Sequence, residues 1–114
     1  MANFKRNKSG AVKQTYKGNS YHSKAEVSYA MYLDSELRGK RIKSWDRQVK
    51  IELFGENGTR ICNYFMDFVV EHLDDRTEYV EVKGFATPTW RIKWKLFNDK
   101  YGKDHSKIIT LVKV

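Results

Sequence analysis

The sequence predicts an α/β (α+β) domain in which a mixed β-sheet is flanked by helices. Two segments place apolar side chains at helical spacing, and the residues between them form alternating or continuous apolar runs that are typical of strands. Asn57-Gly58 lies between two of these runs and is a strong hairpin signal. The element order is therefore α-β-β-β-α-β, which predicts an antiparallel meander and then a crossover helix that brings the last strand parallel to the third.

The first predicted helix covers about residues 23–38. Its stripe of side chains on the buried face runs, at steps of four, three and four, through Glu26, Ala30, Leu33 and Leu37. Glu26 therefore lies at the edge of the buried face, where an acid can approach a site. Ser23-Lys24-Ala25-Glu26 is also a capping box, in which Glu26 only satisfies the first turn. Both interpretations of Glu26 stay open.

Three strands are predicted next. Residues 44–54 alternate apolar and polar side chains, which indicates a half-buried strand. Residues 60–73 are apolar on both faces, which favours a central strand, and the chain reverses at Asp74-Asp75. A third strand then covers about residues 76–83.

The second helix begins at Pro88, with Thr87 as its N-cap, and ends at Gly102. One of its faces carries an aromatic stripe formed by Trp90, Trp94, Phe97 and Tyr101. We interpret this stripe as core rather than as a platform for stacking nucleic-acid bases. Residues 107–114 close the domain as a short buried strand.

Charge separates the first residues from the rest. Lys and Arg number 22 and Asp and Glu 14, so the 114-residue chain has a net charge of +8, which favours a polyanionic partner. Residues 1–22 are small, polar and basic without apolar periodicity, and we expect a flexible basic arm that precedes a domain of residues 23–114. The arm can contact nucleic acid or only aid solubility.

The sequence also bears on the compartment. Cys62 is the single cysteine, which excludes an internal disulfide and a cysteine-based zinc cluster and fits a reducing compartment. The first residues lack the apolar core of a signal peptide, and no apolar run reaches the roughly 18 residues of a membrane span. We therefore expect a cytoplasmic protein that makes no use of a membrane.

An acid stands inside the most apolar strand. Asp67 lies in "YFMDFVV", and a buried carboxylate is costly unless it is paired or binds a metal ion. Glu81 and Lys83 are two residues apart on the next strand and so share one face. If the two strands pair, Asp67 and Glu81 form an oxygen-rich site suited to Mg²⁺ or Mn²⁺. Lys83 can then orient a water or stabilise charge on a phosphate.

These residues also have ordinary structural interpretations, because Glu-x-Lys is often a solvated strand face and Asp67 can be neutralised by a lysine or arginine. Their combination in a basic α-β-β-β-α-β chain nevertheless resembles the PD-(D/E)XK, or restriction-endonuclease-like, nuclease superfamily. The matching residues are Glu26, Asp67, Glu81 and Lys83. Met66 stands where the motif often has proline.

Longer segments carry a closer resemblance. The stretches "YHSKAEVSYAMYLDSE", "YFMDFVVE" and "YVEVKGFATPTWRIKWKLF" are similar to a family of small phage-encoded nucleases in this superfamily, which includes candidate Holliday-junction resolvases. The similarity covers about residues 16–113 and implies a restriction-endonuclease-like core. Gln48 also matches a position typical of the family, without an assigned role.

The resemblance implies roles for the site residues. Asp67 and Glu81 would bind the metal ion, helped by the Val82 carbonyl. Lys83 would position the attacking water, and Glu26 would complete the site directly or through water. Phosphate contacts are expected, on charge alone, from Lys5, Arg6, Lys8, Lys24, Arg91, Lys93 and Lys95.

The function implied is a Mg²⁺- or Mn²⁺-dependent endodeoxyribonuclease, selective for branched DNA such as a Holliday junction, in phage recombination or replication. It would act in the host cytoplasm, and a domain this small is expected to cut two strands as a homodimer. The alternative is a non-catalytic nucleic-acid-binding protein on a nuclease scaffold. An RNA-binding, ribosome-associated protein explains the charge but not the buried Asp67.

Overall fold

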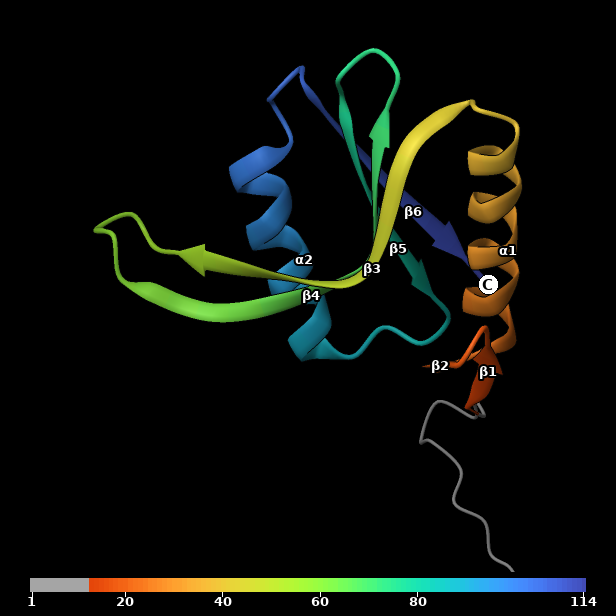
Figure 1. The fold of residues 1–114 in the computed structure, drawn as a ribbon. Coiled ribbons are helices and arrows are strands. Elements are labelled where there is room, and N and C mark those ends of the chain that lie inside the picture. Colours follow the sequence, from red (N-terminus) through yellow and green to blue (C-terminus); the bar gives the residue numbers. More distant parts are fainter. Residues whose placement is uncertain (1–12) are drawn as a thin grey trace, which may run out of the picture.

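The computed structural model describes residues 13–114, so Lys5, Arg6 and Lys8 lie outside the described residues (Figure 1). The elements in chain order are β1 (Gln14–Tyr16), β2 (Asn19–Tyr21), α1 (Lys24–Arg38), β3 (Ile42–Phe54), β4 (Arg60–His72), β5 (Thr77–Lys83), α2 (Pro88–Tyr101) and β6 (Lys107–Lys113). The predicted order α-β-β-β-α-β is confirmed from α1 onward. No helix in the described part of the chain is long and apolar enough to cross a membrane.

The main sheet has four strands in the order β3-β4-β5-β6. The first three strands form the predicted antiparallel meander, and β6 pairs parallel with β5 after the α2 crossover. Val80 and Val82 of β5 pack on the α1 side, whereas Tyr79, which directly precedes Val80, packs on the α2 side. The prediction of a mixed sheet flanked by helices is confirmed.

Both helices begin where the sequence predicts. The Ser23 hydroxyl accepts a hydrogen bond from the Glu26 backbone N–H at 3.2 Å, and the Thr87 hydroxyl accepts one from the Trp90 N–H at 3.1 Å. The buried stripe of α1 ends one turn earlier than predicted, because Leu37 is 40% exposed.

Residues 14–21 correct the predicted arm. They form the β1–β2 hairpin, which turns at Lys17 and Gly18 with φ of +50° and +82°. Tyr21 is 1% exposed and belongs to the core cluster on the α1 side, while the Arg47 guanidinium lies 4.2 Å from its ring centroid. The domain therefore begins before residue 23, because two short strands carry a core tyrosine without any apolar period.

The β3–β4 ribbon bends sharply at its middle. Arg47 pairs with Phe68 and Val49 with Met66, and between these pairs Gln48 adopts a left-handed conformation with φ of +51°. Figure 1 shows that the halves next to the β3–β4 turn pass across α2, while the halves on the other side of the bend run on the α1 side. The bend divides the ribbon between the two layers.

Each half of the ribbon builds its own core cluster. The cluster under α1 contains Tyr21, Ala30, Leu33, Ile42, Phe68, Val70, Val80 and Val82. The cluster under α2 contains Leu53, Tyr64, Met66 and Phe97, with Trp90, Trp94 and Tyr101 packed against it. The interpretation of the α2 aromatic stripe as core is confirmed, and Asp67 lies in the chain between Met66 of one cluster and Phe68 of the other.

Candidate active site

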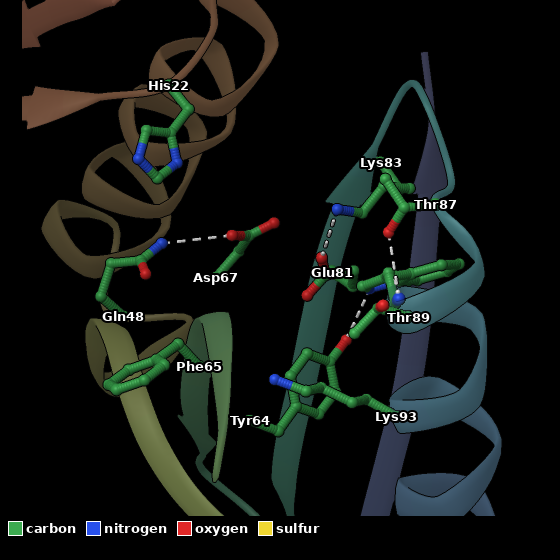
Figure 2. Close-up of a pocket in the computed structure, with 11 residues that line it drawn as sticks. His22, Gln48, Tyr64, Phe65, Asp67, Glu81, Lys83, Thr87, Thr89 and Lys93 are labelled. Atoms are coloured by element: carbon green, nitrogen blue, oxygen red, sulfur yellow. Dashed lines mark hydrogen bonds and ion pairs between the residues drawn. The ribbon is translucent and has the colours of Figure 1, made fainter. Parts of the chain in front are cut away.

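A pocket opens beside the bend of the β3–β4 ribbon. Its volume is about 400 Å³, and its lining includes His22, Gln48, Asp67, Glu81, Lys83 and Lys93. Figure 2 shows these side chains converging from three directions: from the segment before α1, from the strands β3, β4 and β5, and from α2. The pocket lies at the end of the sheet where the pairing of β4 with β5 stops.

The pocket exists because β4 and β5 separate at one end. Their pairing ends at Phe68 and Val80, so the next backbone donors of β5 have no strand partner on β4. The Val82 N–H instead donates to Oδ2 of Asp67 at 2.8 Å, and Gln48 Nε2 donates to Oδ1 at 3.2 Å. The Asp67 side chain thus closes the fork in the sheet and is itself held by two donors.

Glu81 and Lys83 face Asp67 across the fork (Figure 2). Glu81 is 3% exposed, and its Oε2 lies 3.5 Å from the Lys83 Nζ. Its second oxygen, Oε1, is buried and has no hydrogen-bond partner among the described residues. The Lys83 Nζ also lies 5.0 Å from the Trp90 ring centroid. The Tyr64 hydroxyl is near enough to Glu81 to lower the pKa of that carboxyl, but no hydrogen bond of ordinary geometry from the described chain reaches Oε1, so Glu81 presents an open acceptor.

The carboxylates share an environment that disfavours charge. Burial, and then the charge of Asp67, raise the pKa of Glu81 to about 7, against the lowering effect of Lys83. Burial also raises the pKa of Asp67, although the Val82 N–H and the Lys83 charge favour its ionised form. Two neighbouring carboxyl groups with raised pKa values are typical of a site that binds a cation or transfers protons.

Glu26 combines a backbone role in the cap of α1 with a buried side chain near Asp67. Its backbone N–H completes the cap on Ser23, and the side chain is 7% exposed. Burial and then the Asp67 charge raise its pKa to about 7, while the His22 backbone N–H hydrogen-bonds its carboxylate and lowers the pKa. The Asp67 charge therefore acts on Glu26, although Glu26 does not line the pocket.

Within the described part of the chain, no three His, Cys, Asp or Glu side chains gather into a metal-binding group. Glu26 therefore does not form a three-residue metal-binding group with Asp67 and Glu81 among the described residues. The atoms available to a cation are those of Asp67 and the unpaired Oε1 of Glu81. The Lys83 carbonyl accepts from Val114 on the β6 side, so the Val82 carbonyl points to the opposite, β4 side. This all-oxygen donor set fits Mg²⁺ or Mn²⁺.

The alternative interpretation, in which a lysine or arginine neutralises Asp67, is not borne out by a direct ion pair, although the Lys83 charge favours the ionised form of Asp67. No lysine or arginine of the described chain lies within ion-pair distance of its carboxylate, whose partners are an amide and a backbone N–H. The interpretation of Glu-x-Lys as a solvated face fails for Glu81, which is buried.

The predicted phosphate contacts are spread unevenly. Lys93 lines the pocket, where its Nζ donates to the Asn63 carbonyl at 3.1 Å. Lys24, Arg91 and Lys95 are exposed and lie outside the pocket lining.

Sequence reasoning missed several pocket residues. His22 directly precedes the N-cap of α1, and Phe65 lies two residues before Asp67. Proximity to predicted site residues was the available signal for both. The sequence assigns no role to Gln48, and the structure shows that it donates a hydrogen bond to the Asp67 carboxylate.

Residues 6–114 match the family described as "Protein of unknown function (DUF1064)". The chain belongs to this family. No curated protein and no solved structure matches the chain. Membership in DUF1064 covers nearly the whole chain, so the family's shared segment includes both core clusters and the pocket.

Proposed function

We propose that this DUF1064 protein is a metal-dependent endonuclease that hydrolyses phosphodiester bonds in DNA. The observation that carries the proposal is the fork between β4 and β5, where the buried carboxylates of Asp67 and Glu81 meet the Lys83 ammonium in an open pocket. A buried pair of acids is costly in isolation, and a bound divalent cation offsets that cost. The net charge of +8 fits a polyanionic substrate.

Each residue has a part in this proposal. Asp67, Glu81 and the Val82 carbonyl would hold Mg²⁺ or Mn²⁺, and Glu26 would act through water. The ion would supply Lewis acidity to the phosphate and an acidified water. Lys83, drawn away from Glu81, would orient the nucleophile or stabilise charge that develops on the phosphate. Gln48 would hold Asp67 in position.

The proposed substrate is branched DNA, of the Holliday-junction type, in phage recombination or replication within the host cytoplasm. The resemblance to small phage nucleases supports this part of the proposal. Lys93 at the pocket, and more distant basic residues, would contact phosphates and so position the DNA without reading its sequence. The distant set comprises Lys5, Arg6, Lys8, Lys24, Arg91 and Lys95.

The test is cleavage of a labelled four-way junction beside matched duplex, flap and single-stranded DNA, with Mg²⁺, Mn²⁺ or EDTA. Asp67→Asn, Glu81→Gln and Lys83→Ala should each lower the cleavage rate by a hundredfold or more, because each removes an electrostatic part of the site. Asp46→Asn and Glu52→Gln on β3 and Lys100→Ala in α2 change exposed residues outside the pocket and serve as matched controls.

Two results would contradict the proposal. One is the absence of metal-dependent cutting on every substrate. The other is cutting that survives Asp67→Asn and Glu81→Gln as fully as it survives the control changes, since activity would then come from a contaminant.

A second candidate is a DNA-binding protein without catalysis. The absence of a three-residue metal group in the described chain favours it. Such a protein would bind with a steep salt dependence. Asp67→Asn would leave its binding unchanged or strengthen it, because the change removes a negative charge from a surface that meets phosphates. Binding without cleavage in any metal would select this candidate.

We also propose a homodimer, because one domain of this size has one pocket and a junction has two strands to cut. Light scattering after gel filtration, with and without junction DNA, tests this proposal. A monomer at all concentrations in both conditions would contradict it.

A further inference from the structure

Phe65 is an exposed aromatic side chain at the pocket. It lies on β4 two residues before Asp67, lines the pocket and is 51% exposed. It belongs to neither core cluster, and it makes no ring contact with another aromatic residue in the described chain. Figure 2 shows its ring beside Gln48, at the edge of the space that Asp67 and Glu81 face.

The other aromatic residues of the pocket are already engaged. Trp90 stacks on Trp94 at 5.4 Å between ring centroids and carries Lys83 near its ring. Tyr64 is 4% exposed, and its hydroxyl accepts a hydrogen bond from Trp90 Nε1 at 3.0 Å. Phe65 is therefore the aromatic residue of the described pocket with a ring open to a ligand.

Two basic residues are placed near Phe65 by the fold. Lys50, its cross-strand partner on β3, is exposed. Lys93 reaches the same wall of the pocket from α2, where the carbonyl of Asn63, two residues before Phe65, accepts from its Nζ. An exposed aromatic ring accompanied by basic side chains is the arrangement with which proteins bind single-stranded nucleic acid, since the bases stack on the ring and the cations contact phosphates.

We propose that Phe65 stacks on an unpaired nucleobase next to the phosphate in the carboxylate site. This inference rests on the proposed function and names its substrate class: single-stranded DNA, or DNA with a locally unpaired nucleotide. In an intact duplex both faces of each base are covered by neighbouring bases, so stacking on Phe65 requires a base that has left the helix. Phe65 would thereby separate branched and unpaired DNA from continuous duplex.

The test measures binding without cleavage. A labelled oligo-dT strand and a matched duplex are titrated with the protein in EDTA and again in Ca²⁺, with fluorescence anisotropy as the readout. Phe65→Ala should weaken binding of the single strand roughly 5- to 100-fold, the range for one lost base-aromatic stack, and change duplex binding less than about twofold. Phe65→Leu should resemble Phe65→Ala, and Phe65→Tyr should bind like the wild type, because stacking needs the ring.

Phe54→Ala and Ile61→Ala are the matched controls. Both residues are exposed on the same ribbon, at 44% and 58%, and neither lines the pocket. The inference is overturned if Phe65→Ala leaves single-strand binding unchanged, if the control changes weaken binding equally, or if duplex binding falls as much. It is also overturned if Phe65→Ala alters only self-association, since Phe65 would then be a protein contact.

These results are separable from those on catalysis. If the protein cuts DNA with Mg²⁺ while Phe65→Ala binds normally, the nuclease proposal stands and the stacking inference falls. If no metal supports cleavage but the Phe65 variants weaken single-strand binding as described, the stacking surface stands and the nuclease proposal falls.

Discussion

The Asp67 carboxylate takes the place of a strand partner for Val82. Its Oδ2 accepts the Val82 backbone N–H at 2.8 Å, beyond the last β4–β5 pair at Phe68 and Val80. A fork in a sheet leaves backbone donors unpaired in a buried place, which is unfavourable. The Asp67 side chain therefore satisfies the backbone where β4 and β5 separate, and it also lies in the gap between them.

This double role separates two substitutions at one position. Asp67→Asn keeps an oxygen for Val82, whereas Asp67→Ala removes the acceptor, and both abolish the charge. We expect Asp67→Ala to be less stable than Asp67→Asn by about 1–3 kcal/mol in urea unfolding, the cost of an unpaired buried donor. Equal stabilities would show that water satisfies Val82 without Asp67.

The raised pKa values of Glu26 and Glu81, both about 7, make stability depend on pH. A carboxyl group whose folded-state pKa is above its unfolded value favours the folded state when protonated. That stabilisation is fully present below about pH 4.5 and is lost as the pH rises through 7. Without divalent cations, the protein should be less stable at pH 8 than at pH 5, by on the order of 2 kcal/mol.

Urea titrations at several pH values check this slope. Glu81→Gln should flatten it and raise the stability at pH 8. Asp34 contributes with the opposite sign but at lower pH, because the Tyr16 hydroxyl lowers its pKa. A wild-type stability that rises between pH 5 and pH 8 in EDTA would contradict the prediction.

A divalent cation should reverse the cost of the buried acids. We expect saturating Mg²⁺ or Mn²⁺ at pH 8 to raise the melting temperature by about 2–8 °C, because an ion that binds only the folded state stabilises it. The double variant Asp67→Asn/Glu81→Gln should show no such shift. A shift of equal size in the double variant would place the ion elsewhere.

Gln48 offers a test of the bend. With φ of +51° it occupies a conformation that costs little for glycine and more for other residues. Gln48→Gly and Gln48→Ala both lose the hydrogen bond to Asp67, but only glycine relieves the backbone. Gln48→Gly should therefore be more stable than Gln48→Ala by about 1 kcal/mol. At Lys50, an exposed strand position, the same pair of changes should give the opposite order.

The hairpin before α1 should prove essential to the fold. Tyr21 is 1% exposed and stacks on Phe68, so Tyr21→Ala should cost about 3–5 kcal/mol in unfolding free energy. Tyr32→Ala is the control, since Tyr32 is 51% exposed and its loss should cost less than about 1 kcal/mol. If both changes cost little, residues 14–21 behave as part of an arm after all.

The elements of the sheet and helices were predictable because each carries a local pattern. Ser23 and Thr87 marked helix starts through cap chemistry, and Asn57-Gly58 marked the turn that pairs β3 with β4. The approach of Asp67 to Glu81 followed from that pairing and from the period of a strand. These inferences needed only neighbours in sequence.

The remainder depended on tertiary contacts. A non-glycine residue with positive φ leaves no mark in the sequence, so the bend at Gln48 was not predictable. The hairpin of residues 14–21 is too short to show a period, and Tyr21 is buried by Arg47 and Phe68, which are distant in sequence. The sequence does not distinguish Phe65 from other strand residues, and only the structure shows that it lines the pocket.

The division of the sheet has a consequence for how the chain folds. β3 and β4 are joined by a short turn, whereas β6 reaches β5 only after the whole of α2 has formed and crossed the sheet. Contacts that are close in sequence form sooner than those that close long loops. A folding intermediate with only the β3–β4 ribbon in place would hold Asp67 in water, with an ordinary acidity and no Glu81 beside it. Any chemistry of the carboxylate pair therefore belongs to the completed fold alone, and its onset during refolding would report the last step of assembly rather than the first.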